Sequence, residues 1–267
     1  MTLDMSSTSS RRMRKVLIFA SLIVFTAGIV QSMLTLASAA GVWIGIWDFR
    51  RGFELLRLAN TYGDVVAWTC VTLTIAILFA AKLWNTEDIL RIAAFAVTGT
   101  IIAGIAYSIP ETFRPPEGVN YPPIHDISTD LINPPAFAAA LPLRADAPNT
   151  VVYGGSPNMT PARLAELTRE AYPDLIPRTY SEPLSAVFQR ALAAVAELGW
   201  ELVAADQGAG RIEATATTFW FRFKDDIVMT FSESNGQTLV NARSVSRVGV
   251  GDVGANALRL RKFFEIL

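Results

Sequence analysis

The N-terminal part of the chain contains three long apolar windows. Residues 16–40, 65–81 and 92–109 carry no charged side chain. A helix needs roughly 20 predominantly apolar residues to cross a bilayer core about 30 Å thick. The pattern therefore predicts a membrane domain over residues 1–110, with three transmembrane helices at about 16–40, 65–83 and 91–109, and the lipid bilayer as the first partner.

The first window has two interpretations. Arg11, Arg12, Arg14 and Lys15 precede it, and residues 37–39 (Ala-Ser-Ala) resemble a signal-peptidase site. The apolar core of a cleavable signal is only about 7–15 residues long, which favours a retained helix over a cleaved one. The basic N-terminus indicates a cytoplasmic start, so three spans would place everything after residue 110 outside.

A fourth helical pattern lies between the first two windows. Ile46, Phe49, Phe53 and Leu56 recur at helical spacing, and charged residues occupy the positions between them. An amphipathic helix of this kind is typical of a membrane interface. We expect it at about 46–60, on the outer surface of the bilayer.

The fourteen prolines all fall between Pro110 and Pro183. Proline lacks the amide donor and disfavours helix in the residue before it, so residues 111–180 are predicted to form an extended strap. We expect one short helix in it, near residues 161–171. The strap either wraps the following domain or spaces it from the bilayer. The single cysteine, Cys70, lies in the second window and cannot form a disulfide in the outer domain.

Residues 181–267 have the pattern of a small α+β domain. Apolar spacing predicts a helix at 184–198, and period-two or continuous apolar runs predict strands at 200–205, 211–223, 227–231 and 239–248. Asn235-Gly236 is a hairpin signal. A last helix is expected from about Val253, with Val253 on its buried face and Asp252 as its N-cap. The fold class is helix-grip-like: helix, four-stranded antiparallel sheet, helix, with both helices on one face.

Three glycines near the C-terminus have the spacing G-x-G-x-x-G. Gly249, Gly251 and Gly254 follow a predicted strand and precede a predicted helix. A dinucleotide site needs this loop inside a parallel βαβ unit, and only 13 residues follow Gly254. We therefore expect a tight strand-to-helix turn, with no nucleotide and no cofactor.

The strand before these glycines carries alternating polar residues. In "NARSVSRV" the alternation places Ser244 and Ser246 on the face that packs under the helices. Arg243 and Arg247 then share the opposite face, which we expect to be open. Two roles remain for the arginines: cross-strand salt bridges, or a site for an anion or lipid headgroup.

Several stretches resemble a known family. "FRFKDDIVM", "ARSVSRVGVGDVGANALRLRKFF" and "PPIHDISTD" look like the domain of unknown function 1499 family, over about residues 120–267. The three-helix N-terminal part resembles one found in proteobacterial members. The family frequently has Ser at the position of Gly251, which implies that this glycine is incidental. The resemblance implies no established activity.

The remaining candidate chemistry centres on the only histidine. His125, Asp126 and Asp130 are close in "HDISTD" and could hold a hard cation. Turn formation within the strap is the interpretation that we favour. A Ser-His catalytic arrangement would depend entirely on His125.

The polar residues of the outer domain lead to one main functional hypothesis and two alternatives. Residues 111–267 hold 14 basic and 18 acidic groups, a net of −4, which excludes the basic surface that nucleic acids require. We expect a bacterial inner-membrane protein whose periplasmic domain binds an anionic lipid or envelope protein in a non-catalytic assembly role. The alternatives are an envelope hydrolase or transferase with Asp225 or Asp226 as general base, and a purely structural domain. The candidate binding residues are Arg243, Arg247, Asp225, Asp226, Ser244, Ser246, Asp252 and Asn256.

Overall fold

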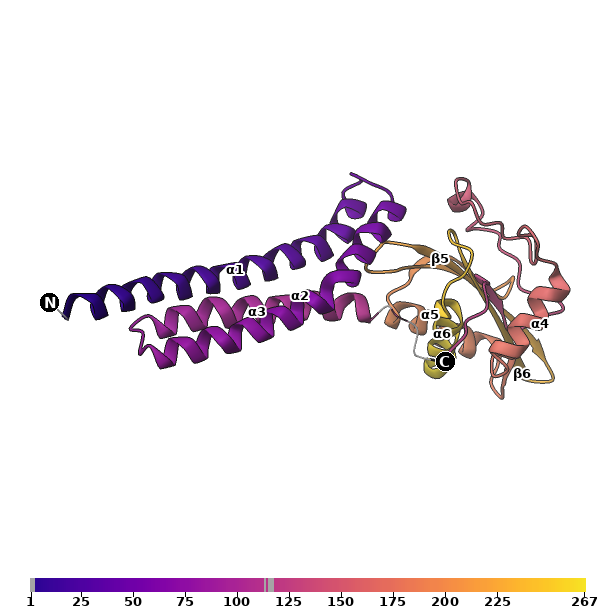
Figure 1. Cartoon of the computed structure of the whole chain (residues 1–267). Helices are drawn as coiled ribbons and strands as arrows, with labels where there is room; N and C mark the ends of the chain where they lie inside the picture. Colours follow the sequence, from indigo (N-terminus) through magenta and orange to yellow (C-terminus); the bar gives the residue numbers. More distant parts are fainter. Residues whose placement is uncertain (1–2, 113, 115–117) are drawn as a thin grey trace. The chain divides into compact units, whose positions relative to one another are not determined.

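The computed structural model describes residues 3–112, 114 and 118–267 (Figure 1). It divides into two compact units, one up to residue 116 and one from residue 117 onward. Residues 113 and 115–117 belong to the expected strap and lie outside the described residues.

The N-terminal unit is formed by three helices. They are α1 (Leu3–Trp43), α2 (Phe49–Leu83) and α3 (Ile89–Glu111), and each is long and apolar enough to cross a membrane. Each helix packs against the other two. The prediction of three long apolar helices is confirmed, although α1 begins well before residue 16 because the helix continues through the basic N-terminal residues.

Helix α2 contains both the expected interfacial helix and the second expected span. Asp48 caps its first turn by accepting a hydrogen bond from the backbone N–H of Arg51 at 3.1 Å. No proline interrupts residues 49–83. Gly63 lies inside this helix and is buried, and a Cβ atom at this position would lie only 2.9 Å from the ring of Tyr107. The helix expected at 46–60 therefore begins only at Phe49, and from there it continues without a break into the apolar span.

Small and hydroxylated residues make the close contacts inside this unit. A Cβ on Gly99 of α3 would come within 2.7 Å of the backbone nitrogen of Phe25 in α1. Between α2 and α3, the hydroxyls of Thr74 and Thr100 lie 2.7 Å apart. Close backbone approach at glycine and interhelical hydroxyl bonds are typical of packing between helices in a membrane.

The C-terminal unit is built on an antiparallel sheet. Its strands are β1 (Asp126–Ser128), β2 (Arg178–Tyr180), β3 (Glu201–Asp206), β4 (Arg211–Thr217), β5 (Lys224–Ser234) and β6 (Gln237–Ser246). The order is β1-β6-β5-β4-β3, and β2 also pairs with β6. A two-residue turn at Asn235 and Gly236, both at positive φ, joins β5 to β6 as predicted.

Two of the six strands come from the proline-rich segment and were not expected. β1 pairs with residues 243–245 of β6, and β2 pairs with residues 238–240 at its other end. Without them β6 would be an edge strand with unpaired backbone groups. The described part of the strap thus completes the sheet.

Three helices accompany the sheet: α4 (Pro161–Ala171), α5 (Leu184–Glu197) and α6 (Ala255–Ile266). The short helix α4 lies where the sequence predicts one. Helices α5 and α6 contact each other and the sheet, as Figure 1 shows. Their main apolar contributions to the core are Val187, Phe188, Ala191, Val195, Ala257, Leu260, Phe263 and Phe264. The expected α+β class, an antiparallel sheet followed by a final helix, is confirmed.

The other face of the sheet is covered, where we expected it to be open. Phe137 and Ala140, in the segment between β1 and α4, pack on Val228 of β5 and Val245 of β6. A short 3-10 helix, η1 (Pro142–Arg144), follows them. This face is covered because the strap supplies apolar side chains that pack on the strand residues pointing to this side of the sheet.

Several boundaries differ from the sequence-based expectation. Strand β5 covers residues 224–234 instead of 227–231, and β6 covers 237–246 instead of 239–248. Two further differences have a local cause. Strand β4 ends at Thr217, because the N–H of Phe223 donates to the hydroxyl of Thr218 at 2.9 Å and closes a loop with Arg222 at φ 57°. Helix α6 starts at Ala255, and Val253 precedes it at φ 53° with its side chain exposed. Val253 is therefore not part of the buried helix face to which we assigned it.

Candidate functional site

Arg243 is buried under the strap. Its Nε and Nη2 donate to Oδ1 and Oδ2 of Asp126 at 2.8 and 2.7 Å. Nη1 and Nη2 also donate to the carbonyls of Pro135 at 3.0 Å and Val151 at 2.7 Å. Only 3% of the Arg243 side chain is exposed. The expectation that this arginine stands on an open face is wrong, because residues of the strap surround its guanidinium group.

Asp226 forms the second buried ion cluster on the same face. Arg247 donates to both carboxylate oxygens at 2.9 and 2.8 Å, and Arg144 and the hydroxyl of Thr215 add bonds of 2.6 and 2.7 Å. Burial by itself raises the pKa of Asp226, but these hydrogen bonds outweigh it and hold the pKa below its ordinary value. Such a carboxylate is a poor general base.

Arg144 was not among the residues singled out from the sequence. It belongs to η1, is 4% exposed in its side chain, and also donates to the carbonyls of Val245 at 3.1 Å and Ser246 at 3.2 Å. Nothing in its neighbourhood, "LPLRADAP", indicates that it pairs with an aspartate 82 residues away. Only the folding of the strap onto the sheet brings the two together.

Glu213 was also missed, although its position carries a signal. It stands in the middle of "RIEATAT", and in the structure it is 1% exposed. Its carboxylate accepts the backbone N–H groups of Ala138, Ala139 and Ala140 at 2.8, 3.1 and 2.8 Å. A charged residue between the apolar Ile212 and Ala214 of a predicted strand is the feature that could have identified Glu213 from the sequence.

The opposite face of β6 carries a network that joins it to α6. Ser244 and Ser246 bond to the side chain of Asn256 at 2.6 and 2.9 Å. Arg259 of α6 donates to Asp225 at 2.6 Å and also contacts Asn256. The two serines lie on the helix face as predicted. Asp225 is paired with Arg259 and not with the arginines of β6.

The N-cap residue of α6 is Gly254 and not Asp252, as we expected, because the helix begins only at Ala255. Asp252 still binds the start of the helix. Its carboxylate accepts the N–H groups of Gly254 at 2.9 Å and Asn256 at 2.8 Å. Burial raises the pKa of Asp252, and these backbone bonds only partly offset the effect. The glycine-rich stretch connects β6 to α6, and β6 is antiparallel to both β1 and β5. This connection is not the parallel unit of a dinucleotide site.

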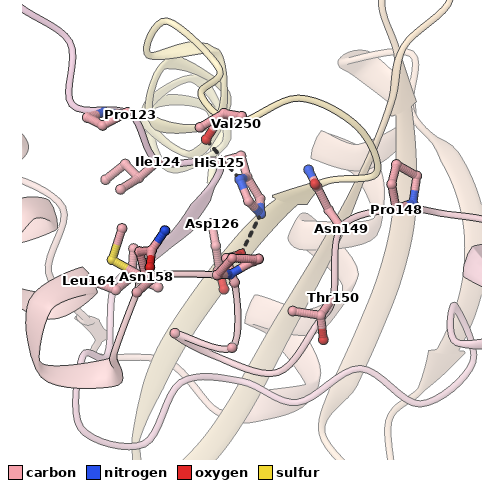
Figure 2. A pocket seen from close by; sticks show the side chains of 15 residues that line it. Pro123, Ile124, His125, Asp126, Pro148, Asn149, Thr150, Asn158, Leu164 and Val250 are labelled. Carbon is pink, nitrogen blue, oxygen red and sulfur yellow. Dashed lines mark hydrogen bonds between the residues drawn. The ribbon is translucent and has the colours of Figure 1, made fainter.

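A pocket of about 440 Å³ opens beside His125 in the C-terminal unit (Figure 2). This volume lies within the range of roughly 300–1,000 Å³ that is usual for small-molecule sites. The strap contributes most of the wall, and the loop after β6 contributes Val250. Its lining includes the side chains of His125, Thr150, Ser156, Asn158, Met159 and Leu164.

His125 is the central polar side chain of this pocket. Its Nδ1 lies 3.1 Å from the carbonyl oxygen of Val250, and its Nε2 lies 3.5 Å from the hydroxyl of Ser156. Figure 2 shows the ring between these two contacts. The histidine is 7% exposed, so its ring orientation is fixed by the surrounding structure.

The other two members of the candidate cation set are used differently. Asp126 binds Arg243, and Asp130 accepts the N–H groups of Ile132 at 3.0 Å and Asn133 at 2.8 Å in a turn. Among the residues that the structure describes, no group of three or more His, Cys, Asp or Glu side chains is arranged to hold a metal ion. The turn-forming role of Asp130 agrees with the interpretation that we favoured.

Ser156 had no recognisable signal in the sequence. It follows two glycines in "YGGSPN", and 30 residues separate it from His125. Both reach the pocket because β1 holds the strap at one end of β6 while the chain returns across the same region before α4. The pairing is a product of the strap's path over the sheet.

Apolar membrane helices followed by a six-stranded α+β domain define a membrane-associated protein with a folded C-terminal part. Residues 126–267 match the family described as "Protein of unknown function (DUF1499)", and this match covers more than half of the chain. The chain belongs to that family. Among curated proteins and among solved structures, no match to the chain was found.

Proposed function

We propose that this chain is a membrane-anchored binding protein whose C-terminal domain receives an uncharged ligand in the pocket beside His125. The observation that carries the proposal is the pocket itself, in which a histidine, hydroxyls and an amide meet apolar side chains. A concave, mainly apolar recess with a few converging polar groups is the usual form of a small-molecule site.

The charge of the pocket lining supports an uncharged ligand. No Lys or Arg side chain is among the lining residues, and the one acidic lining residue, Asp126, is neutralised by its bidentate pair with Arg243. Arg243 and Arg247, which were expected to attract an anionic envelope component, direct their guanidinium groups to Asp126 and Asp226. An anion bound there would have to displace a buried carboxylate. We therefore place the ligand in the pocket and assign the arginines to the stability of the domain.

The hydrolase alternative that uses Asp225 or Asp226 finds no support in this geometry. Arg259 binds the carboxylate of Asp225, and two arginines with one threonine bind that of Asp226. A general base must be free to accept a proton from a bound substrate. Arg259 donates to one oxygen of Asp225, and both oxygens of Asp226 accept from its partners.

We place the C-terminal domain in the periplasm of a bacterium, with the N-terminus in the cytoplasm, because basic residues precede the first of three apolar spans. In a Cys70→Ala background, a membrane-impermeant maleimide should label Ser185→Cys in intact cells. It should label Glu87→Cys, in the turn between α2 and α3, only after lysis. The reverse pattern would invert the orientation.

The binding function is tested by filling the pocket. The full chain is purified in detergent as wild type, as Thr150→Trp in the pocket wall, and as Val152→Trp, an exposed position that is not part of the lining. Co-purifying small molecules are then identified by mass spectrometry. A species retained by wild type and Val152→Trp but lost from Thr150→Trp supports the proposal. Identical profiles in all three proteins contradict it.

A further inference from the structure

The tautomer of His125 follows from its contacts. A backbone carbonyl can only accept a hydrogen bond, so the contact of 3.1 Å with Val250 requires that Nδ1 carries the proton. In the neutral ring, Nε2 then presents a lone pair, and it faces the hydroxyl of Ser156 at 3.5 Å. A serine hydroxyl, an imidazole that can accept its proton, and a third group that orients the imidazole are therefore aligned in one pocket.

We propose that Ser156 is a nucleophile activated by His125, and that the pocket hydrolyses uncharged acyl esters. This inference rests on the proposed function, since the same pocket must first admit a ligand, and it departs from the non-catalytic role expected from the sequence. The distance of 3.5 Å between Oγ and Nε2 is longer than the 2.6–3.2 Å of a working pair. Catalytic hydrogen bonds in unliganded sites commonly tighten only when substrate binds.

The chemistry needs only the ester and water. Oγ of Ser156 attacks the carbonyl carbon, its proton moves to Nε2 of His125, and the bond from carbon to the leaving oxygen breaks. The leaving alkoxide takes that proton and departs as an alcohol. Water then gives a proton to Nε2 and adds its oxygen to the acyl carbon. The bond to Oγ breaks, Oγ regains the proton, and a carboxylic acid leaves.

The pocket lining defines the substrate class. Met159 and Leu164 offer apolar surface for an acyl chain, and the volume of about 440 Å³ limits its length to a short or medium chain. Asn158 places a side-chain amide on the same wall, two residues beyond Ser156. Side-chain amides of this type can stabilise the oxyanion of an acyl-transfer reaction. The lack of a cationic lining residue disfavours a charged acid or phosphate ester.

Two probes test the inference on the full chain in detergent. A fluorophosphonate reports a nucleophilic serine by covalent labelling, and p-nitrophenyl butyrate reports turnover. Peptide mass spectrometry should place the label on Ser156. Ser156→Ala should abolish labelling and turnover, and His125→Gln should lower both by about 100-fold or more. Ser185→Ala, an exposed serine of α5, is the matched control and should behave as wild type.

The outcomes separate this inference from the function on which it rests. Labelling at Ser156 with loss of turnover in Ser156→Ala supports it. A wild type that retains its pocket ligand but is labelled elsewhere, or not at all, overturns the catalytic inference and leaves the binding function standing. If Thr150→Trp changes neither the co-purifying ligand nor the labelling, both are overturned.

Discussion

Arg243 and Asp126 form a bidentate ion pair that joins the strap to the centre of the sheet. The two N–O distances are 2.8 and 2.7 Å, and the side chains are 3% and 7% exposed. The rings of Phe137 and Tyr153 lie 5.5 and 5.4 Å from the guanidinium carbon. Burial raises the pKa of Tyr153 to about 12, so this ring is a neutral cover for the pair.

Arg243→Ala should strongly destabilise the C-terminal domain. Removal of one partner from a buried pair leaves an uncompensated charge, at a cost of about 3–5 kcal/mol. Arg190→Ala, which breaks an exposed pair with Glu182, is the control and should cost at most about 1 kcal/mol. Urea unfolding of the full chain in detergent measures both. Equal losses in the two variants would show that Arg243 is not the anchor that its contacts indicate.

The lowered pKa of Asp226 should make the C-terminal domain less stable in acid. Its folded-state pKa lies below the ordinary value, so its contribution is fully present above about pH 4 and is lost as the pH falls through the folded pKa. Asp226→Asn should be less stable than wild type at pH 7 and should show a flatter decline below pH 4. The exposed Asp146→Asn should follow the wild-type curve. Melting temperatures from pH 7 to pH 3 test this, and parallel curves for Asp226→Asn and wild type would contradict it.

Glu213→Ala should release part of the strap. It leaves three backbone N–H groups, those of residues 138–140, without their acceptor, and each buried unsatisfied donor costs about 1–3 kcal/mol. Limited proteolysis should then cut faster within residues 133–151. Glu201→Ala, at an exposed position of the neighbouring strand β3, should leave the cleavage rate unchanged. Unaltered proteolysis of Glu213→Ala would mean that other contacts hold the segment.

Gly99 and Gly104 form a matched pair for testing the membrane helices. A Cβ on Gly99 would lie 2.7 Å from a backbone atom of Phe25, whereas a Cβ on Gly104 in the same helix meets nothing within 4 Å. Gly99→Leu should therefore force α1 and α3 apart and lower the melting temperature in detergent. Gly104→Leu should have little effect, because its side chain has room. A similar shift in both variants would place the cause in helix propensity rather than in packing.

The site was only partly accessible to sequence reasoning. Alternation along β6 correctly separated Arg243 and Arg247 from Ser244 and Ser246, because successive side chains in a strand point to opposite faces. It could not show that the arginine face is covered, since the cover comes from residues more than 90 positions earlier. For the same reason it did not pair Asp126 with Arg243, and it did not pair Ser156 with His125 because the strap between them has no periodic pattern.

The sequence by itself determined the properties that depend on local pattern. These are the three apolar membrane helices, the α+β class, the hairpin at Asn235 and Gly236 and the short helix at 161–171. Only the tertiary structure decided the path of the strap, which adds β1 and β2 to the sheet, buries both ion clusters and forms the pocket beside His125. The physical reason is that proline-rich segments have no periodic pattern to predict their contacts, which arise from complementary surfaces that meet only in the folded chain.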